Sequence, residues 1–364
     1  MNNIDAVYIH IPFCKTICSY CDFCKIIYNK KYIADYLKTL NQEIKTFYKN
    51  DIIKTLYIGG GTPSSLEIDD VKRLMKILKQ FKVSKNLEFT VELNVEHINK
   101  ELLSLLYQNG VNRLSIGVQT FNENHLKLLK RNHQQEDVLK AINLAKEIGF
   151  NNLNIDLIYA LPNQTKEELL SDLNVFLKLD INHLSIYSLI IEPQTLLYIN
   201  KTNYLDEELD YEMYKLINDF LTKKGYLHYE LSNYCKPGFE GKHNLGYWNN
   251  LEYYGFGMGA SGYVDNIRYT NTLNINKYIN NHFHDKEELI DIKPKLENEF
   301  MLGLRKIKGI NKQLFLKKYG FQIDEILEIK KLIKEGKLID DKINIYISPE
   351  YLYLSNDILI DLMV

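Results

Sequence analysis

The sequence has almost no net charge, no long apolar run and few cysteines, and each shortage excludes a class of protein. Across 364 residues, 45 lysines and arginines face 47 aspartates and glutamates, so the formal net charge is −2. That balance provides no general attraction for nucleic acid. No stretch reaches the roughly 18 consecutive apolar residues of a membrane span. Residues 1–5 carry no basic segment, so we expect no signal peptide and a location in the reducing cytoplasm.

Four of the five cysteines lie between residues 14 and 24, directly after the apolar run from Ala6 to Ile11. The spacing of Cys14, Cys18 and Cys21 lets three thiolates surround one small cubane, and thiolate sulfur is the ligand that iron–sulfur clusters take. Three protein ligands would leave one iron open to a substrate. The sequence therefore predicts a [4Fe–4S] cluster at these three cysteines.

Other interpretations of this cysteine segment remain open. A structural zinc site usually uses two separated cysteine pairs, whereas these cysteines crowd into one loop. A disulfide would suit a secreted protein, and nothing else marks the chain as secreted. The cysteines could also be buried side chains that cluster by chance.

Short β-branched or apolar runs alternate with segments of helical period through the first part of the chain. The expected strands are Val7–Ile9, Thr55–Ile58, Leu87–Glu92, Arg113–Gly117, Asn152–Leu157 and His183–Tyr187. The expected helices are about Lys31–Tyr48, Ile68–Gln80, Lys100–Gln108, Glu123–Lys130, Glu136–Glu147, Lys166–Leu179 and Glu207–Lys223. Six such repeats predict an α/β fold with a parallel sheet curved into a partial (β/α)6, TIM-like barrel. An open doubly wound sheet is the alternative.

Polar or glycine-rich residues follow five of the expected strands. The cysteine segment follows the first strand and Gly59-Gly60-Gly61-Thr62-Pro63 the second, and then come Glu92, Gln119 and Asp156. Because the carboxyl ends of barrel strands meet at one rim, we expect these residues to form one site. Glycines there would let the backbone approach a ligand closely. Taken singly, each could also be an ordinary turn, cap or exposed carboxylate.

The C-x3-C-x2-C spacing, with Tyr20 before the third cysteine, resembles the radical S-adenosylmethionine (SAM) superfamily. The order of the other residues, with Tyr8 six positions before Cys14, resembles its branch of oxygen-independent coproporphyrinogen III dehydrogenase and haem chaperones. In the superfamily the open iron binds the amino and carboxylate groups of SAM, and an electron from the cluster cleaves SAM to a 5′-deoxyadenosyl radical. The resemblance implies a SAM site formed by Tyr8, Tyr20, Gly60, Gly61, Thr62, Glu92, Gln119, Arg131 and Asp156. Glu92 could hold ribose hydroxyls or the ammonium group, and Arg131 could bind a carboxylate through its fork.

Residues 226–290 are rich in aromatics, glycine and asparagine, and we expect an extension of the core domain (1–225) there. Within it, His243-Asn244-Leu245-Gly246-Tyr247-Trp248 resembles the His-Asn-x-x-Tyr-Trp motif associated with haem binding in the chaperones. The resemblance implies His243 as an axial ligand, with Tyr247 and Trp248 as apolar walls. A structural role for this loop is the alternative. Cys235 is either a second haem ligand or a buried inert thiol.

Residues 291–364 are expected to form a small winged-helix-like domain. The pattern predicts helices at Leu296–Leu304, Lys312–Lys318 and Asp324–Glu335, strands at Ile343–Ile347 and Tyr351–Leu354, and a last helix near Asn356–Met363. Five lysines could contact phosphate, but interspersed acidic residues favour a solvated face: Lys306, Lys308, Lys312, Lys317 and Lys318.

Two features favour the chaperones within the branch. The dehydrogenase has a long segment before its first strand and a further cysteine two positions after the third cluster cysteine, where this sequence has Phe23. The sequence also departs from the chaperone pattern. Cys24 stands where a small polar residue is usual and is either a spare ligand or neutral, Val95 replaces a common proline, and Ser261 replaces a frequent histidine.

The resemblance therefore implies a protein that binds haem and delivers it to acceptor proteins, with a SAM-ligated cluster that needs an electron donor. The alternative is an enzyme that oxidatively decarboxylates coproporphyrinogen III. A third interpretation, radical modification of a nucleic acid or peptide, rests on the winged-helix-like domain alone. Whether SAM is cleaved stays open.

Overall fold

The computed structural model describes residues 4–362, and the chain divides into two compact units. The first unit comprises Met1–Met213 and Glu252–Leu289, and the second comprises Tyr214–Leu251 and Ile290–Val364. Each unit therefore contains two separate stretches of the sequence. The expected three-part division with boundaries at 225 and 290 stays a prediction.

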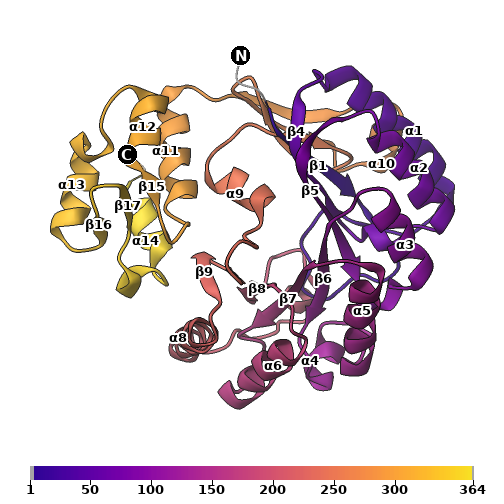
Figure 1. Cartoon of the computed structure of the whole chain (residues 1–364), viewed down its shortest axis with the longest axis horizontal. Helices are drawn as coiled ribbons and strands as arrows, with labels where there is room; N and C mark the ends of the chain where they lie inside the picture. Colours follow the sequence, from indigo (N-terminus) through magenta and orange to yellow (C-terminus); the bar gives the residue numbers. More distant parts are fainter. Residues whose placement is uncertain (1–3, 363–364) are drawn as a thin grey trace. The chain divides into compact units, whose positions relative to one another are not determined.

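The first unit is built on a sheet of parallel strands in the order β11-β1-β4-β5-β6-β7-β8. The strands are β1 (Ala6–Ile11), β4 (Ile52–Gly60), β5 (Lys82–Asn94), β6 (Arg113–Gln119), β7 (Asn152–Tyr159), β8 (His183–Ser188) and β11 (Tyr254–Phe256). Six of them lie where the sequence predicted strands, and each extends beyond the expected range. The predicted parallel sheet of a partial barrel is confirmed (Figure 1).

Helices follow the strands and cover one face of this sheet (Figure 1). They are α1 (Lys30–Phe47), α2 (Ile68–Leu78), α3 (Lys100–Gln108), α4 (Glu123–Leu128), α5 (Gln135–Ile148) and α6 (Lys166–Lys178). α7 (Leu196–Ile199) and α8 (Glu207–Lys223) follow β8, and α8 begins in the first unit and ends in the second. Local sequence sets their starts: the side chain of Asn29 accepts a hydrogen bond from the amide of Lys31, and Thr165 and Glu168 form a capping box. Within residues 4–362, no helix combines the length and apolarity needed to cross a membrane.

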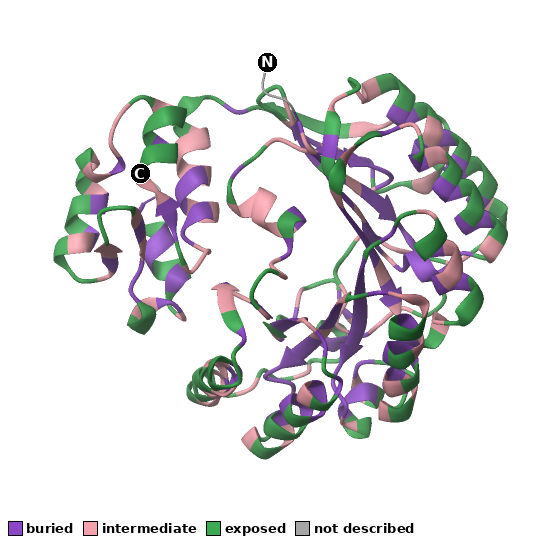
Figure 2. Cartoon of the chain, viewed as in Figure 1, coloured by how far each residue is buried: buried purple, intermediate pink, exposed green. Residues whose placement is uncertain are grey.

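The two faces of the sheet differ in chemistry because side chains alternate along each strand. Ile58 and Val91 line the same apolar space as Leu74 of α2 and Leu102 of α3, so this face packs on the helices. Figure 2 shows the buried strands and the exposed outer sides of the helices. The alternate positions on the other face are largely polar: Tyr57, Thr90, Glu92, Ser115, Asn154 and Asp156. The predicted carboxylates therefore lie on the face that the helices leave free.

The stretch Glu252–Leu289 adds an edge strand and a small sheet to the first unit. β11 pairs in parallel with β1, with Ile9 opposite Phe256. β12 (Ser261–Val264), β13 (Ile267–Asn271) and β14 (His284–Leu289) form an antiparallel sheet, and α10 (Ile275–Ile279) lies between the last two strands. The sequence pattern gave no sign that this late stretch returns to pair with the first strand.

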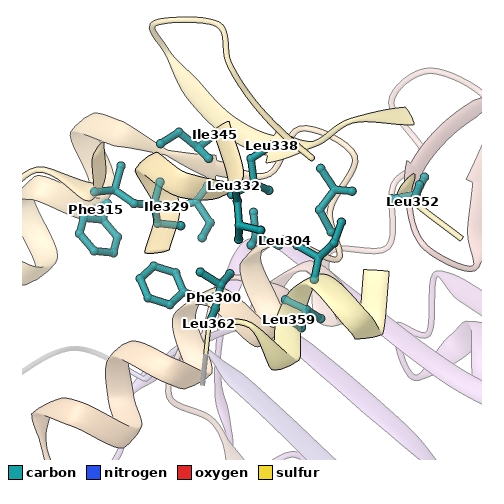
Figure 3. Packing of buried hydrophobic residues seen from close by; sticks show 14 residues of the cluster. Phe300, Leu304, Phe315, Ile329, Leu332, Leu338, Ile345, Leu352, Leu359 and Leu362 are labelled. Carbon is teal, nitrogen blue, oxygen red and sulfur yellow. The ribbon is translucent and has the colours of Figure 1, made fainter. Parts of the chain in front are cut away.

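The second unit contains a β-hairpin, a short helix and a helical domain with its own core. β9 (Leu227–Glu230) pairs with β10 (Asn233–Cys235), and α9 (Lys242–Trp248) follows. The domain consists of α11 (Ile292–Gly303), α12 (Lys312–Tyr319), α13 (Leu327–Lys334), α14 (Ser355–Ile360) and the antiparallel strands β15 (Ile310–Asn311), β17 (Asn344–Ile347) and β16 (Leu338–Asp340). Phe300, Leu304, Phe315, Ile329 and Leu332 pack together in its core (Figure 3). This arrangement agrees with the expected winged-helix-like domain.

The hairpin of this domain differs from the predicted one. β17 pairs with β16, with Leu338 opposite Ile347, whereas Tyr351–Leu354 was predicted as a strand and is not one. Pro349, which has no amide proton, begins a 3-10 turn, Pro349–Tyr351, in which the Tyr351 amide donates to the Ser348 carbonyl at 2.8 Å. The turn ends the ladder after Ile347.

Ion pairs occupy two of the five lysines that were weighed as phosphate contacts. Lys312 Nζ lies 2.7 Å from Asp340 Oδ2 and 3.0 Å from Asp324 Oδ2, and Lys318 pairs with Glu299. Burial lowers the pKa of Lys306 to about 8. These contacts argue against a phosphate-binding face on this domain.

Candidate functional site

The cysteine segment is a loop closed at its base by a short parallel pair. β2 (Phe13–Cys14) pairs with β3 (Ile26–Ile27), and the Tyr28 amide donates to the Cys14 carbonyl at 2.8 Å. Lys25 Nζ donates to the carbonyls of Cys21 and Phe23 at 2.6 and 3.2 Å. These hydrogen bonds hold the loop at its base. Its cysteines form no disulfide.

Two of the predicted cluster ligands contact side chains from other loops. Cys14 is 5 % exposed, and its Sγ lies 3.4 Å from Thr62 Oγ1. An Arg131 guanidinium nitrogen lies 3.8 Å from Cys18 Sγ. Burial raises the pKa of Cys14 to about 11 and also raises that of Cys21. Cluster binding would therefore have to displace thiol protons.

The residues of the loop fit a cluster with three cysteine ligands. Gly61 passes so close to Cys14 that a Cβ at this glycine would lie 3.0 Å from Cys14 Sγ and 2.7 Å from the Pro12 carbonyl carbon. Three free thiols in one loop, with Cys14 beside the backbone of Gly61, are a donor set suited to iron–sulfur chemistry. Among residues 4–362, no three His, Cys, Asp or Glu side chains meet as they would around a single metal ion. The assignment of Cys14, Cys18 and Cys21 as ligands stays a prediction.

The thiol of Cys24 packs against a turn that contains Gly259. A Cβ at Gly259 would lie 2.4 Å from Cys24 Sγ, so only a glycine fits beside this thiol. The carbonyl of Cys24 accepts a hydrogen bond from His10 Nε2 at 2.7 Å. These contacts favour a packing role for Cys24 over that of a spare ligand.

The glycine segment and Glu92, which are separate features in the sequence, contact each other directly in the structure. The amide of Gly60 donates to Glu92 Oε2 at 3.1 Å, and the Tyr57 hydroxyl donates to Oε1 at 2.8 Å. Gly60 has φ 116°, a conformation that favours glycine, and a Cβ at Gly59 would collide with the Glu92 carboxyl at 2.7 Å. Burial raises the pKa of Glu92 to about 7. The carboxyl is thus held beside the strand end where a ligand would approach.

Tyr8 is held by a buried histidine that the sequence analysis missed. The Tyr8 hydroxyl lies 3.0 Å from His10 Nδ1, and burial lowers the pKa of His10 to about 4. Because His10 Nε2 donates to the Cys24 carbonyl, Nδ1 of the neutral ring accepts from Tyr8. The ring also fills the space that a Cβ at Gly60 would need, at 2.7 Å. Its position two residues after Tyr8, on the same face of β1, was the available signal.

Arg131 is 5 % exposed and joins the ends of β5 and β6. Its NH1 donates to Asn94 Oδ1 at 2.9 Å, and its NH2 donates to the Gly117 carbonyl at 2.7 Å and to Glu96 Oε2 at 3.2 Å. Although burial opposes it, a hydrogen bond from His133 and the charge of Arg131 lower the pKa of Glu96 to about 2. The buried Nε of Arg131 has no partner within the described residues. This donor is available to a carboxylate ligand.

Three further predicted SAM residues lie in or directly after strands of the same sheet: Gln119 in β6, Asp156 in β7 and Thr62 after β4. Gln119 ends β6 with φ 74°, and a Cβ at Gly117 would lie 2.9 Å from its Nε2. Asp156 accepts from Asn154 Nδ2 at 2.8 Å and from Ser115 Oγ at 3.3 Å, and burial raises its pKa. Thr62 Oγ1 accepts from Asn94 Nδ2 at 3.4 Å.

Tyr20 forms an apolar side of the cysteine loop. It packs against a buried cluster made of Leu129, Ile158, Leu161, Leu189, Ile191 and Leu197. The loop is also tied there by its backbone, since the Leu197 amide donates to the Ser19 carbonyl at 3.0 Å. Burial raises the pKa of Tyr20 well above its ordinary value. Its role toward SAM stays a prediction.

Comparison with known proteins identifies the family. The radical SAM superfamily matches residues 8–176. The "Heme chaperone HemW" of Lactococcus lactis is 40 % identical over 97 % of this chain and 96 % of its own length, and that of Bacillus subtilis is 39 % identical over 97 % of each. The chain belongs to the HemW family of radical SAM proteins. A more distant HemW, from Escherichia coli, is 31 % identical over 92 % of each chain.

A solved structure shares the fold of this HemW family member. Coproporphyrinogen III oxidase (HemN) from Escherichia coli, described as a radical SAM enzyme, superimposes with a TM-score of 0.86 over 99 % of this chain and 90 % of its own. The two sequences are 23 % identical, so this likeness concerns the fold. It confirms the predicted α/β radical SAM architecture.

The His-Asn-x-x-Tyr-Trp motif of this HemW family member lies in the second unit. It forms α9, in which His243 is 2 % exposed and its Nε2 lies 2.8 Å from the Tyr247 hydroxyl. The two rings meet edge to face, with centroids 4.9 Å apart. Cys235 in β10 is fully buried. A haem iron could bind His243 Nε2 only after the Tyr247 hydroxyl moves away, and the haem ligand stays a prediction.

Proposed function

We propose that this chain is a haem chaperone that binds haem and passes it to acceptor proteins, and that it carries a [4Fe–4S] cluster with SAM as an exchangeable ligand. The observation that supports this most strongly is the 40 % identity to a HemW over nearly the whole of both chains. The cluster would be held by Cys14, Cys18 and Cys21. Because such a cluster and its thiolates need a reducing compartment, we place the protein in the cytoplasm.

The residues around the cysteine loop suit SAM as the ligand of the cluster. Bound there, the cluster supplies an electron that can cleave the sulfonium of SAM. Arg131, with its free buried Nε, would bind the SAM carboxylate, and Glu92 would accept hydrogen bonds from the ammonium group or the ribose. Gly60 and Gly61 leave room for the ligand, while Tyr8 is oriented by His10. In this proposal these residues bind and orient SAM.

A second candidate function is oxidative decarboxylation of coproporphyrinogen III, favoured by the fold shared with HemN. The two functions are separated by incubating the anaerobically reconstituted protein with SAM, a reductant and coproporphyrinogen III. We expect no protoporphyrinogen, and we expect haem-loaded protein to transfer haem to an apo-haem protein. Formation of protoporphyrinogen would reverse the order of the two proposals. Haem acceptors and the electron donor of the cluster are to be found among proteins of the same compartment.

The pKa of Glu92 predicts how SAM binding depends on pH. A carboxyl with a pKa raised to about 7 is protonated below that pH, and the protonated form loses an acceptor that SAM requires. SAM affinity should therefore weaken as the pH falls below 7, by up to about tenfold per unit. Glu92→Gln should bind SAM at least about tenfold more weakly above pH 7 and should show a flat profile there. Affinity is measured by titration of the reconstituted protein.

Glu230→Gln is the matched control for this experiment. Burial also raises the pKa of Glu230 to about 7, but this residue lies in the second unit, in β9. We expect it to keep the affinity and pH profile of the unmodified protein. A pH-independent affinity in the unmodified protein would remove Glu92 from the SAM site.

A further inference from the structure

A second buried carboxylate lies behind the cysteine loop. Glu43 of α1 is fully buried and accepts three hydrogen bonds. The Tyr278 hydroxyl and the Gly257 amide donate to Oε2 at 2.5 and 2.9 Å, and Asn271 Nδ2 donates to Oε1 at 2.5 Å. All three donors come from the stretch 252–289, more than 200 residues later in the chain. Glu43 therefore joins the late stretch of the first unit to its first helix.

The segment bound by Glu43 is the turn Gly257-Met258-Gly259, which follows β11. Asn271 Nδ2 also donates to the Gly257 carbonyl at 2.8 Å, so one amide group holds both the turn and the carboxyl. Gly257 has φ 102°, and a Cβ there would lie 2.4 Å from the His10 carbonyl oxygen. The turn thus presses directly on β1 at the residue that orients Tyr8.

A tyrosine and a second glycine connect the same turn to the site. The Tyr36 hydroxyl donates to the His10 carbonyl at 2.5 Å and accepts from the Met258 amide at 3.3 Å. On the other side, Gly259 contacts Cys24 so closely that no Cβ fits between them. His10 then donates to the Cys24 carbonyl through Nε2. The turn held by Glu43 therefore contacts Cys24, at the end of the cysteine loop, in two ways: directly through Gly259, and indirectly through Tyr36 and His10.

We propose that Glu43 is a positioning residue for the cluster and SAM site: it fixes the turn Gly257–Gly259 behind β1 and thereby sets the positions of His10, Tyr8 and Cys24. The proposal rests on the proposed function, since it assumes a cluster and SAM in this site. A carboxylate can accept from all three donors, whereas the amide of a glutamine would turn an N–H donor toward at least one of them.

The test compares Glu43→Gln with Glu299→Gln in the full-length reconstituted protein. Glu299 is also a buried carboxylate, which accepts from the Tyr319 hydroxyl at 2.9 Å, but it lies in the second unit. The readouts are iron content, thermal unfolding, the electron paramagnetic resonance spectrum of the reduced cluster with and without SAM, and the affinity for SAM. We expect Glu43→Gln to keep its iron, to bind SAM at least about fivefold more weakly and to alter the SAM-dependent change of the spectrum.

Glu299→Gln should lower thermal stability without changing either spectrum. Tyr278→Phe, which removes one donor and leaves the carboxyl in place, should shift SAM affinity in the same direction by less and serves if Glu43→Gln does not fold. A SAM response in Glu43→Gln and Tyr278→Phe identical to that of the unmodified protein would overturn the role of Glu43. Absence of a SAM response in the unmodified protein would instead overturn the proposed cluster function, so the two failures are distinguishable.

Discussion

Replacing Cys18 with alanine should remove the iron–sulfur cluster. With two cysteines left in the predicted triad, reconstituted protein should lose most of its iron and sulfide and the visible absorption of the cluster. The physical reason is that thiolates hold the cluster, and no other cysteine is free to replace Cys18: Cys24 packs against Gly259, and Cys235 is buried in the second unit. Iron and sulfide analysis of anaerobically reconstituted protein measures the loss.

Cys24→Ala provides the matched control, because it removes a thiol from the same loop. It should retain its iron, since the hydrogen bond from His10 to the carbonyl of residue 24 is kept when the thiol is removed. A Cys18→Ala variant with an undiminished cluster spectrum would contradict the assignment. So would unmodified protein that contains zinc and no iron, which would restore the zinc interpretation.

Replacing His243 with alanine should weaken haem binding by more than about tenfold, or about 1.4 kcal/mol. The loss follows from removal of the proposed axial imidazole, and an anaerobic haem titration that follows the Soret band measures it. His228→Ala is the control: this half-buried histidine of the same unit stacks on Tyr234 with ring centroids 4.3 Å apart and lies outside the motif. It should bind haem as the unmodified protein does.

Tyr247→Phe tests the same proposed ligand by removing the hydroxyl group that contacts it. The Tyr247 hydroxyl occupies His243 Nε2 at 2.8 Å, so removing it frees the nitrogen that the iron would take. We expect haem binding at least as tight as in the unmodified protein. Equal affinities in the His243→Ala variant and the unmodified protein would exclude His243 as the ligand and leave Cys235 or another group to be tested.

Much of the site could be predicted because strand order alone brings it together. Five of the six expected strands were followed by a polar or glycine-rich feature, and parallel strands place their carboxyl ends at one edge. The contacts of Cys14 with Thr62, Cys18 with Arg131 and Gly60 with Glu92 follow from that geometry. Their individual roles toward SAM stay predictions.

The misses have other causes: one is a local turn, and the others depend on long-range packing. Tyr351–Leu354 alternates like a strand, but Pro349 starts a turn and the hairpin forms one segment earlier. His10 looked like an ordinary strand residue until its ring was seen against Gly60 and the Cys24 carbonyl. Glu43 sits in an amphipathic helix, where a single acidic residue carries no signal.

The sequence by itself determined the cysteine spacing, the order of strands and helices, and the glycine positions, because these depend on local periodicity and on covalent order along the chain. Only the tertiary structure decided that β11 returns to β1, that Gly257–Gly259 lies behind His10, and that Glu43 binds the turn. These contacts join segments more than 200 residues apart. Local pattern does not encode such pairings, since they are selected by the burial and hydrogen bonding of the folded unit as a whole.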